Sequence, residues 1–273
     1  MKFNIIFVAL IAFSTSFISC SNDDNNNVTQ GTVGDVQLYF DNGVNGDALI
    51  LGSTYTNSNN ESLTVNRLNY IISNVVLVQA DGTEYIYPKE ESYFIISAED
   101  NRLTIHLEDI PAGDYSTLKF GIGVDQQRYL QGETQQQSFW DLATQYNLTW
   151  TWSTGYRFIN FEGSFTAPGL DGSKTFQVHQ GSNSATDNYR EVALTLPTTA
   201  RVRQGDEPSI HLKTDANVLL DGQTKVKLAD NLNEAQTGAA VMGGENLIHI
   251  ADNSTAMFTI DHVHNGNGAH EEE

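Results

Sequence analysis

The sequence contains few cysteines, prolines and basic residues. Cys20 is the only cysteine among 273 residues, so an internal disulfide is excluded. The 14 Lys and Arg residues are outnumbered by 34 Asp and Glu residues, which gives a formal net charge of -20. Such an acidic surface repels nucleic acid and anionic lipid headgroups and attracts cations. The charge therefore argues against nucleic-acid binding, although a solvated acidic exterior explains it without any metal ion.

Enzyme motifs are also lacking. The chain has no Gly-x-Ser-x-Gly nucleophile elbow and no His-Glu-x-x-His zinc motif. Pairs of carboxylates carry little information, because 34 acidic residues bring two together by chance in almost any fold. We therefore expect a protein that is not an enzyme.

The only long apolar run lies at the amino terminus. Lys2 supplies a positive charge before the apolar run, which covers residues 5–13. Residues 1–19 together have the pattern of a secretory signal peptide. The run is too short to span a bilayer as a permanent helix. Ile-Ser-Cys at the end of this segment resembles a bacterial lipobox, so we expect lipidation of Cys20. Residues 20–33 then predict a flexible acidic tether, and we expect an outer membrane lipoprotein on the cell surface or the periplasmic face.

The remaining chain, about 250 residues, is long enough for a sizeable core. No Pro-rich or Gly/Ser-rich break divides it. Short β-forming runs between Gly, Asn and Asp clusters predict an all-β, antiparallel β-sandwich-like single domain over residues 34–264, followed by a disordered acidic tail over 265–273. The expected strands span residues 36–40, 63–78, 84–87, 93–96, 103–107, 115–122, 148–152, 157–161, 175–179, 191–196, 209–213, 224–228 and 257–262.

Two segments predict short helices. The first begins with a capping box from Ser138 to Asp141, and its apolar residues recur every three or four positions as far as Tyr146. The second covers residues 245–251. Its apolar side chains, which we expect to pack inward, are Leu247, Ile248 and Ile250.

The most informative segment carries two of the three tryptophans. Residues 150–163 read Trp-Thr-Trp-Ser-Thr-Gly-Tyr-Arg-Phe-Ile-Asn-Phe-Glu-Gly, and residues 177–181 read Gln-Val-His-Gln-Gly. If residues 148–152 form a strand, Trp150 and Trp152 project from one face, about 6.5 to 7 Å apart. Both indoles then line one core surface or one pocket.

This pattern resembles the MbnP-like family of bacterial copper-binding proteins, which is named for a methanobactin-associated member. Three more segments resemble the same family: Leu-Asn-Tyr-Ile-Ile-Ser-Asn at 68–74, Ile-Pro-Ala-Gly-Asp-Tyr at 110–115 and Phe-Gly-Ile-Gly-Val-Asp at 120–125. Together these matches cover most of residues 34–264. The resemblance implies an extracytoplasmic, lipid-anchored copper-binding protein that acts in copper acquisition or handling.

The resemblance also implies particular ligands. Methanobactin-associated relatives use histidines and a tryptophan oxidised to kynurenine, whose new amine can coordinate copper. By correspondence, Trp150 or Trp152 takes the aromatic position and His179 supplies an imidazole, and a diheme peroxidase of the methanobactin-associated type is the implied partner that oxidises the tryptophan. An unmodified indole offers only an N–H donor. The other interpretation, in which both tryptophans and His179 are ordinary core residues, stays open.

The second imidazole is not assigned by the pattern. Relatives that place a histidine two residues from the modified tryptophan would have it at position 148 or 152, which here hold Leu148 and Trp152. His262 and His264 form the best alternative cluster, because residues i and i+2 of a strand share a face. A solvated tail that binds metal adventitiously would explain this pair equally well. The candidates for the second ligand are His106, His211, His249, His262 and His264.

A second class of function also fits an exported lipoprotein. A non-metal surface protein that binds a glycan or a peptide would use exposed aromatic rings as stacking platforms. Tyr156 and Trp140 are the candidates for such rings.

Overall fold

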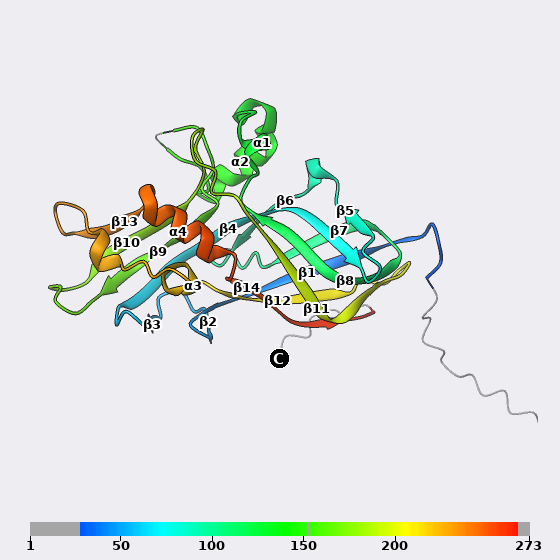
Figure 1. Cartoon of the computed structure of the whole chain (residues 1–273), viewed down its shortest axis with the longest axis horizontal. Helices are drawn as coiled ribbons and strands as arrows, with labels where there is room; N and C mark the ends of the chain where they lie inside the picture. The colour runs from blue at the N-terminus through cyan, green and yellow to red at the C-terminus, as the bar shows by residue number, and fades with distance from the viewer. Residues whose placement is uncertain (1–27, 152, 267–273) are drawn as a thin grey trace, which may run out of the picture.

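Residues 28–151 and 153–266 are described by this computed structural model, and they form two packed β-sheets (Figure 1). The expectation of an all-β, sandwich-like fold is confirmed. The strands are β1 (Val33–Val44), β2 (Asp47–Ala48), β3 (Thr54–Thr56), β4 (Ser62–Gln79), β5 (Glu84–Ile86), β6 (Tyr93–Ser97), β7 (Thr104–Pro111), β8 (Gly113–Ile122), β9 (Ile159–Thr166), β10 (Lys174–Gln180), β11 (Arg190–Val202), β12 (Ser209–Asp215), β13 (Gly238–Val241) and β14 (Phe258–His264). The α-helices are α1 (Gln126–Tyr129), α2 (Gln137–Gln145), α3 (Val218–Asp221) and α4 (Gly244–Ser254).

The smaller sheet has the order β14-β12-β1-β2, with β7 also paired to β1. The larger sheet has the order β11-β8-β4-β9-β10-β13, with β3, β5 and β6 also paired to β4. Most pairs are antiparallel, but β1 pairs with β12 and β10 with β13 in parallel. These two parallel pairs depart from the purely antiparallel expectation. Strand direction depends on the long connections between partners, and the residue pattern within a strand does not encode it.

The core lies between the two sheets. Along β1, Val36, Leu38 and Phe40 are fully buried, while the residues between them face outward. This alternation is the period of a strand with one buried face. Phe258 of β14 packs edge-to-face against Phe40 at 6.2 Å and against Phe120 of the larger sheet at 5.2 Å between ring centroids. The two inner faces therefore share one aromatic core.

Helix α2 covers a second, smaller core cluster, in which Ala143 is buried and Phe139 and Trp140 are partly buried. The predicted helix is present, but it begins at Gln137, and no side chain among the residues that the structure describes caps its first turn. A 3₁₀ turn over Glu133–Gln136 leads directly into it. The predicted capping role of Ser138 was therefore wrong, because this residue already lies inside the helix.

Helix α4 extends beyond the predicted range at both ends. Its residues Leu247, Ile250 and Ala251 are buried, whereas Ile248 is 39% exposed. The expectation that Ile248 packs inward was wrong, since only one stripe of a surface helix can face the core. The one-turn helices α1 and α3 had no counterpart in the prediction.

Two of the expected strands are loops. Residues 148–151 carry only an isolated bridge between Thr149 and Tyr156. Residues 224–227 carry only a bridge from Asp221 to Lys225, and a 3₁₀ turn begins at Leu228. The first segment turns back at Gly155, whose φ of 144° is rarely adopted by other residues. Trp150 thus lies in a tight loop, and its place beside other side chains is set by that turn rather than by strand alternation.

No helix in the described part of the chain is long and apolar enough to cross a membrane. The expected signal peptide, the expected lipidation site Cys20, most of the expected tether, Trp152 and most of the acidic tail lie outside the described residues.

Candidate functional site

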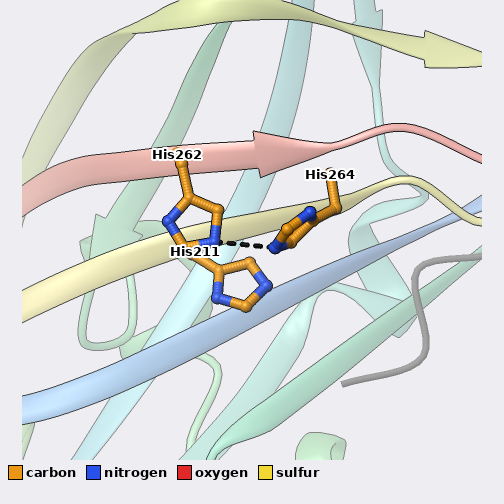
Figure 2. A group of neighbouring side chains, drawn as sticks. All are labelled: His211, His262 and His264. Carbon is orange, nitrogen blue, oxygen red and sulfur yellow. Dashed lines mark hydrogen bonds between the residues drawn. The ribbon is translucent and has the colours of Figure 1, made fainter. Parts of the chain in front are cut away.

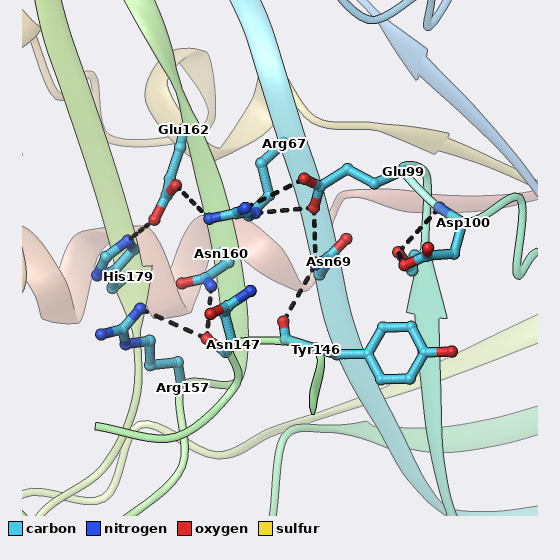
Figure 3. Close-up of polar contacts among 11 residues, drawn as sticks. Arg67, Asn69, Glu99, Asp100, Tyr146, Asn147, Arg157, Asn160, Glu162 and His179 are labelled. Atoms are coloured by element: carbon cyan, nitrogen blue, oxygen red, sulfur yellow. Dashed lines mark hydrogen bonds and ion pairs between the residues drawn. The ribbon is translucent and has the colours of Figure 1, made fainter. Parts of the chain in front are cut away.

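His179 of β10 lies in the larger sheet beside Glu162 of β9 (Figure 3). His179 is the register partner of Asn160, so Glu162 is its diagonal neighbour on the same face of the sheet. His179 is 1% exposed, and its Nε2 lies 2.6 Å from Oε1 of Glu162. The histidine predicted from the sequence is therefore a buried residue held by a carboxylate.

The charges around this pair define which nitrogen of His179 carries its proton. Burial raises the pKa of Glu162, but the hydrogen bond from His179 and the positive charges of Arg67 and Arg157 outweigh it and lower the pKa overall. Burial also lowers the pKa of His179. The hydrogen bond with Glu162 raises this pKa, but burial outweighs it and the pKa is lowered overall. A neutral imidazole beside an ionised carboxylate donates its Nε2–H, and its lone pair is then on Nδ1. Among residues 28–151 and 153–266, this buried Nδ1 has no hydrogen-bond partner.

Trp150 closes one side of His179. Its side chain is 9% exposed, and its ring lies 5.8 Å from the imidazole between centroids. The guanidinium of Arg157 lies 5.0 Å from the centre of the indole. A Cβ at Gly181 would come within 3.1 Å of the indole, so only glycine fits there without a shift. The structure thus brings Trp150 and His179 together, while Trp152 is outside the described residues.

Arginine and glutamate side chains continue this network toward β4. Arg67 binds Glu99 at 2.7 Å and Glu162 at 2.8 Å, so Glu162 is shared between a guanidinium and an imidazole (Figure 3). Burial lowers the pKa of Arg157, whose Nη1 donates to the carbonyl oxygen of Asn147 at 3.4 Å. These contacts fix the orientation of the imidazole and leave one nitrogen lone pair of His179 for a ligand.

A second group of imidazoles lies on the smaller sheet. His211 of β12 and His262 and His264 of β14 each offer a nitrogen, and these three nitrogens lie within 4.8 Å of one another (Figure 2). His262 Nε2 is 2.9 Å from His264 Nε2. The His211 ring stacks on the His262 ring at 4.2 Å and meets the His264 ring edge-on at 5.1 Å. We call these three residues the histidine triad.

A β-bulge in β14 determines where the triad points. His211 pairs with His262, but Leu212 pairs with Ile260, so Asp261 is an extra residue between them. Its carboxylate accepts a hydrogen bond from Nδ1 of His262 at 2.9 Å. The same carboxylate forms an ion pair with the ammonium group of Lys213 at 3.1 Å. The extra residue therefore shifts the register of the strand, and its carboxylate holds the imidazole of His262 by a hydrogen bond.

The other candidate histidines lie apart from both groups. His106 of β7 is exposed and pairs with Glu207 at 2.7 Å, and His249 of α4 lies 3.8 Å from Glu245. Sequence reasoning placed His211 only among five candidates. The sequence signal for it is weak, because the pairing of β12 with β14 joins segments that are far apart in the chain.

The predicted stacking platform at Tyr156 was wrong. Tyr156 is 1% exposed, and its hydroxyl donates to Oε1 of Gln136 at 3.0 Å. Its ring meets Trp140 edge-to-face at 5.1 Å between centroids. Tyr156 belongs to the core beneath α2, because the loop after Gly155 folds it under the helix, and Trp140 of α2 is partly buried against that core.

The fold and these side chains define a β-sandwich protein that carries one buried imidazole, His179, on the larger sheet and the histidine triad on the smaller sheet. Residues 33–242 match the sequence family MbnP, and the chain belongs to this family. The resemblance inferred from the tryptophan motif is thereby confirmed.

Comparison of the structures gives a more distant likeness. MbnP from Methylosinus trichosporium is similar at 14% sequence identity over 86% of this chain and 99% of that chain, with a TM-score of 0.45. No curated protein matches this chain. The family assignment therefore rests on the sequence match, and His262 and His264 lie beyond the matched range.

Proposed function

We propose that this chain binds copper at a centre that contains His179 and acts in copper acquisition or handling outside the cytoplasm. The observation that carries the proposal is the buried Nδ1 of His179 beside Trp150, which has no hydrogen-bond partner in the part of the chain that the structure describes. A buried polar atom without a partner is costly, and a bound ion would remove that cost. Membership of the MbnP family supports copper as the metal.

The contact with Glu162 supports the same assignment. Histidines that bind metals commonly donate their other ring N–H to a carboxylate, which fixes the tautomer and increases the basicity of the ligand nitrogen. His179 and Glu162 have this arrangement, with 2.6 Å between Nε2 and Oε1. Imidazole nitrogen is a suitable ligand for copper. The nearby guanidiniums of Arg67 and Arg157 repel cations, so the monovalent cuprous ion costs less here than a divalent ion.

His179 supplies only one ligand, and we propose that a tryptophan product supplies another. Trp150 is in ring contact with His179, but an unmodified indole has no lone pair suited to a metal. Oxidation of Trp150 to kynurenine would add an aromatic amine on the same side of the imidazole. Trp152, two residues away, is the alternative position for this modification. A diheme peroxidase of the methanobactin-associated type is the proposed partner for the oxidation.

The amino-terminal pattern completes the proposal. We infer that residues 1–19 are removed, that Cys20 is lipidated, and that the chain is held at the outer membrane on the cell surface or the periplasmic face. We further propose that the protein carries copper and is not an enzyme.

The test is copper retention by the protein from its native host. The chain is purified with His262→Ala and His264→Ala in place, so that the histidine triad does not contribute, and copper per chain and intact mass are measured. We expect close to one copper ion per chain. We also expect the intact mass to differ from that of the unmodified chain by the mass change for conversion of one tryptophan to kynurenine.

A His179→Ala version of the same chain should lose the copper. The matched control is His106→Ala, which removes an exposed imidazole that is paired only with Glu207 in the described contacts. Retention of copper by the His179→Ala chain, or copper-free protein of unmodified mass, would contradict the proposal.

A further inference from the structure

We propose that His211, His262 and His264 form a second metal centre, separate from His179, that binds a divalent cation of the zinc or cupric type. The triad lies on β12 and β14 of the smaller sheet, whereas His179 lies on β10 of the larger sheet. Two of its three residues lie outside the range that matches the family. The centre therefore does not depend on the proposed function.

The nitrogen atoms are already close to the spacing that a metal requires. A tetrahedral ion with Zn–N bonds of about 2.0–2.1 Å holds its ligand nitrogens about 3.3 Å apart. One nitrogen from each histidine of the triad lies within 4.8 Å of the other two, and the Nε2 atoms of His262 and His264 are 2.9 Å apart. Small rotations of the side chains about their own bonds would bring all three nitrogens onto one ion.

The scaffold holds the rings on one face. His211 and His262 are direct partners across antiparallel strands, and His264 follows two positions later on the same face. Figure 2 shows the three rings close to one another, His262 and His264 from β14 and His211 from β12. Sites built on strands hold their geometry better than sites on loops, so little ordering is needed when an ion binds.

Asp261 orients one of the ligands. Its Oδ2 accepts the Nδ1–H of His262 at 2.9 Å, which leaves the lone pair of His262 on Nε2, the atom that faces His264. Lys213 holds the other carboxylate oxygen at 3.1 Å. Histidines that bind metals commonly donate the N–H of their other ring nitrogen to a carboxylate in this way. Asp261 is thus a positioning residue for the site.

The donor set indicates the class of metal. Three neutral imidazoles suit Zn²⁺, Cu²⁺ and Ni²⁺, whereas Ca²⁺ and Mg²⁺ require oxygen ligands. His211 is 5% exposed, His262 is partly buried and His264 is exposed, so one side of the triad is open to solvent. Three protein ligands with an open position allow an ion to enter from solution and to exchange its fourth ligand. The net charge of -20 raises the local concentration of such cations.

The test is titration of the full chain with Zn²⁺ and, separately, Cu²⁺. A His179→Ala background removes the proposed copper centre, so the outcomes of the two proposals are read independently. His264→Gln is the main variant, because His264 is exposed and its replacement leaves the core intact. His106→Gln is the matched control, since this exposed imidazole lies on β7, which β1 separates from β12. Far-UV circular dichroism checks that each variant is folded.

We expect one saturable site in the background protein and in His106→Gln. Asp261→Asn should weaken the affinity by about 10–100-fold, the range for loss of a residue that orients a ligand, and His264→Gln, which removes a ligand, should weaken it at least as much. Zn²⁺ should also raise Tm in the background protein and not in His264→Gln, because an ion that binds only the folded state stabilises it. Equal affinity in the background protein and His264→Gln would mean adventitious binding only and would overturn the proposal. Absence of any saturable site would overturn it as well.

Discussion

His211 and His262 are direct partners across β12 and β14, and their rings stack with 4.2 Å between centroids at an interplanar angle of 24°. This pairing exists because Asp261 is inserted as a bulge before His262. Side chains alternate between the two faces of a strand, so a shift by one residue exchanges the faces. Without the bulge, His262 and His264 would point toward the core. A single extra residue therefore decides that the imidazoles converge on the outer face.

Glu162→Gln should weaken copper binding at His179. The amide cannot carry the negative charge that accepts the Nε2–H of His179, so the tautomer with a free Nδ1 is less favoured. We expect a loss of about 10–100-fold in copper affinity, measured by competition with a chelator in the chain that lacks His262 and His264. Glu99→Gln is the control, because it removes the other carboxylate bound to Arg67 without touching His179. An equal loss in both variants would assign the effect to Arg67 instead.

Gly181→Ala should destabilise the fold around Trp150. The new Cβ would lie 2.5 Å from the backbone oxygen of Tyr156 and 3.1 Å from the indole of Trp150, and the backbone contact cannot be relieved by a side-chain rotation. We expect the free energy of unfolding to fall by about 1–3 kcal/mol, as for other overpacked sites. Urea unfolding measures it. Gly243→Ala is the matched control, because no atom of the described residues lies within 4 Å of its Cβ position, and a loss below about 1 kcal/mol is expected there.

Asp125→Asn should destabilise the protein near neutral pH. Burial raises the pKa of Asp125, but the hydrogen bonds from Tyr93, Lys89 and Asn74 outweigh it and lower the pKa overall. The Asp125 contacts include a Tyr93 hydroxyl at 2.6 Å and a Lys89 ammonium at 2.9 Å. Loss of the charge should lower the free energy of unfolding by about 1–3 kcal/mol.

The sign of the pH dependence at Asp125 follows from linkage. Because the folded pKa lies below the unfolded value of about 3.9, the ionised carboxylate stabilises the fold above that pH and this contribution is lost as pH falls through the folded pKa. The difference between wild type and Asp125→Asn in urea unfolding should therefore shrink below about pH 4. The half-exposed Asp114, paired with Arg203 at 2.8 Å, is the control, and Asp114→Asn should cost about 0–1 kcal/mol. A difference that stays constant with pH would contradict the assignment.

Trp150→Phe should remove most of the fluorescence change caused by copper. Bound copper quenches indoles in its immediate surroundings, and Trp150 lies 5.8 Å from His179 between ring centroids. The measurement is a copper titration of recombinant chain with His262→Ala and His264→Ala, in which Trp150 is an unmodified indole and copper is expected to bind through His179 with lower affinity than in the kynurenine form. Trp140→Phe, which removes an indole that contacts Tyr156 rather than His179, should retain the quenching. Undiminished quenching in Trp150→Phe would place the metal elsewhere.

The fold class could be predicted because its signals are local. Val36, Leu38 and Phe40 alternate with outward residues in β1, and short runs of this kind recur between turns. The loop around Trp150 could not be predicted in the same way. Its residues have strong β preference, but the bridge from Thr149 to Tyr156 turns the chain back on itself. Long-range packing under α2 overrides the local preference there.

The sequence by itself determined the all-β class, the acidic charge, the family and the pairing of a tryptophan segment with His179 as a candidate site. Each of these depends on composition, on short-range periodicity or on a motif. The tertiary structure alone decided that Nδ1 of His179 is buried without a partner in the described residues, and that His211 meets His262 and His264. Register and bulges between distant strands set these contacts, and they depend on the packing of the whole sandwich rather than on any one segment.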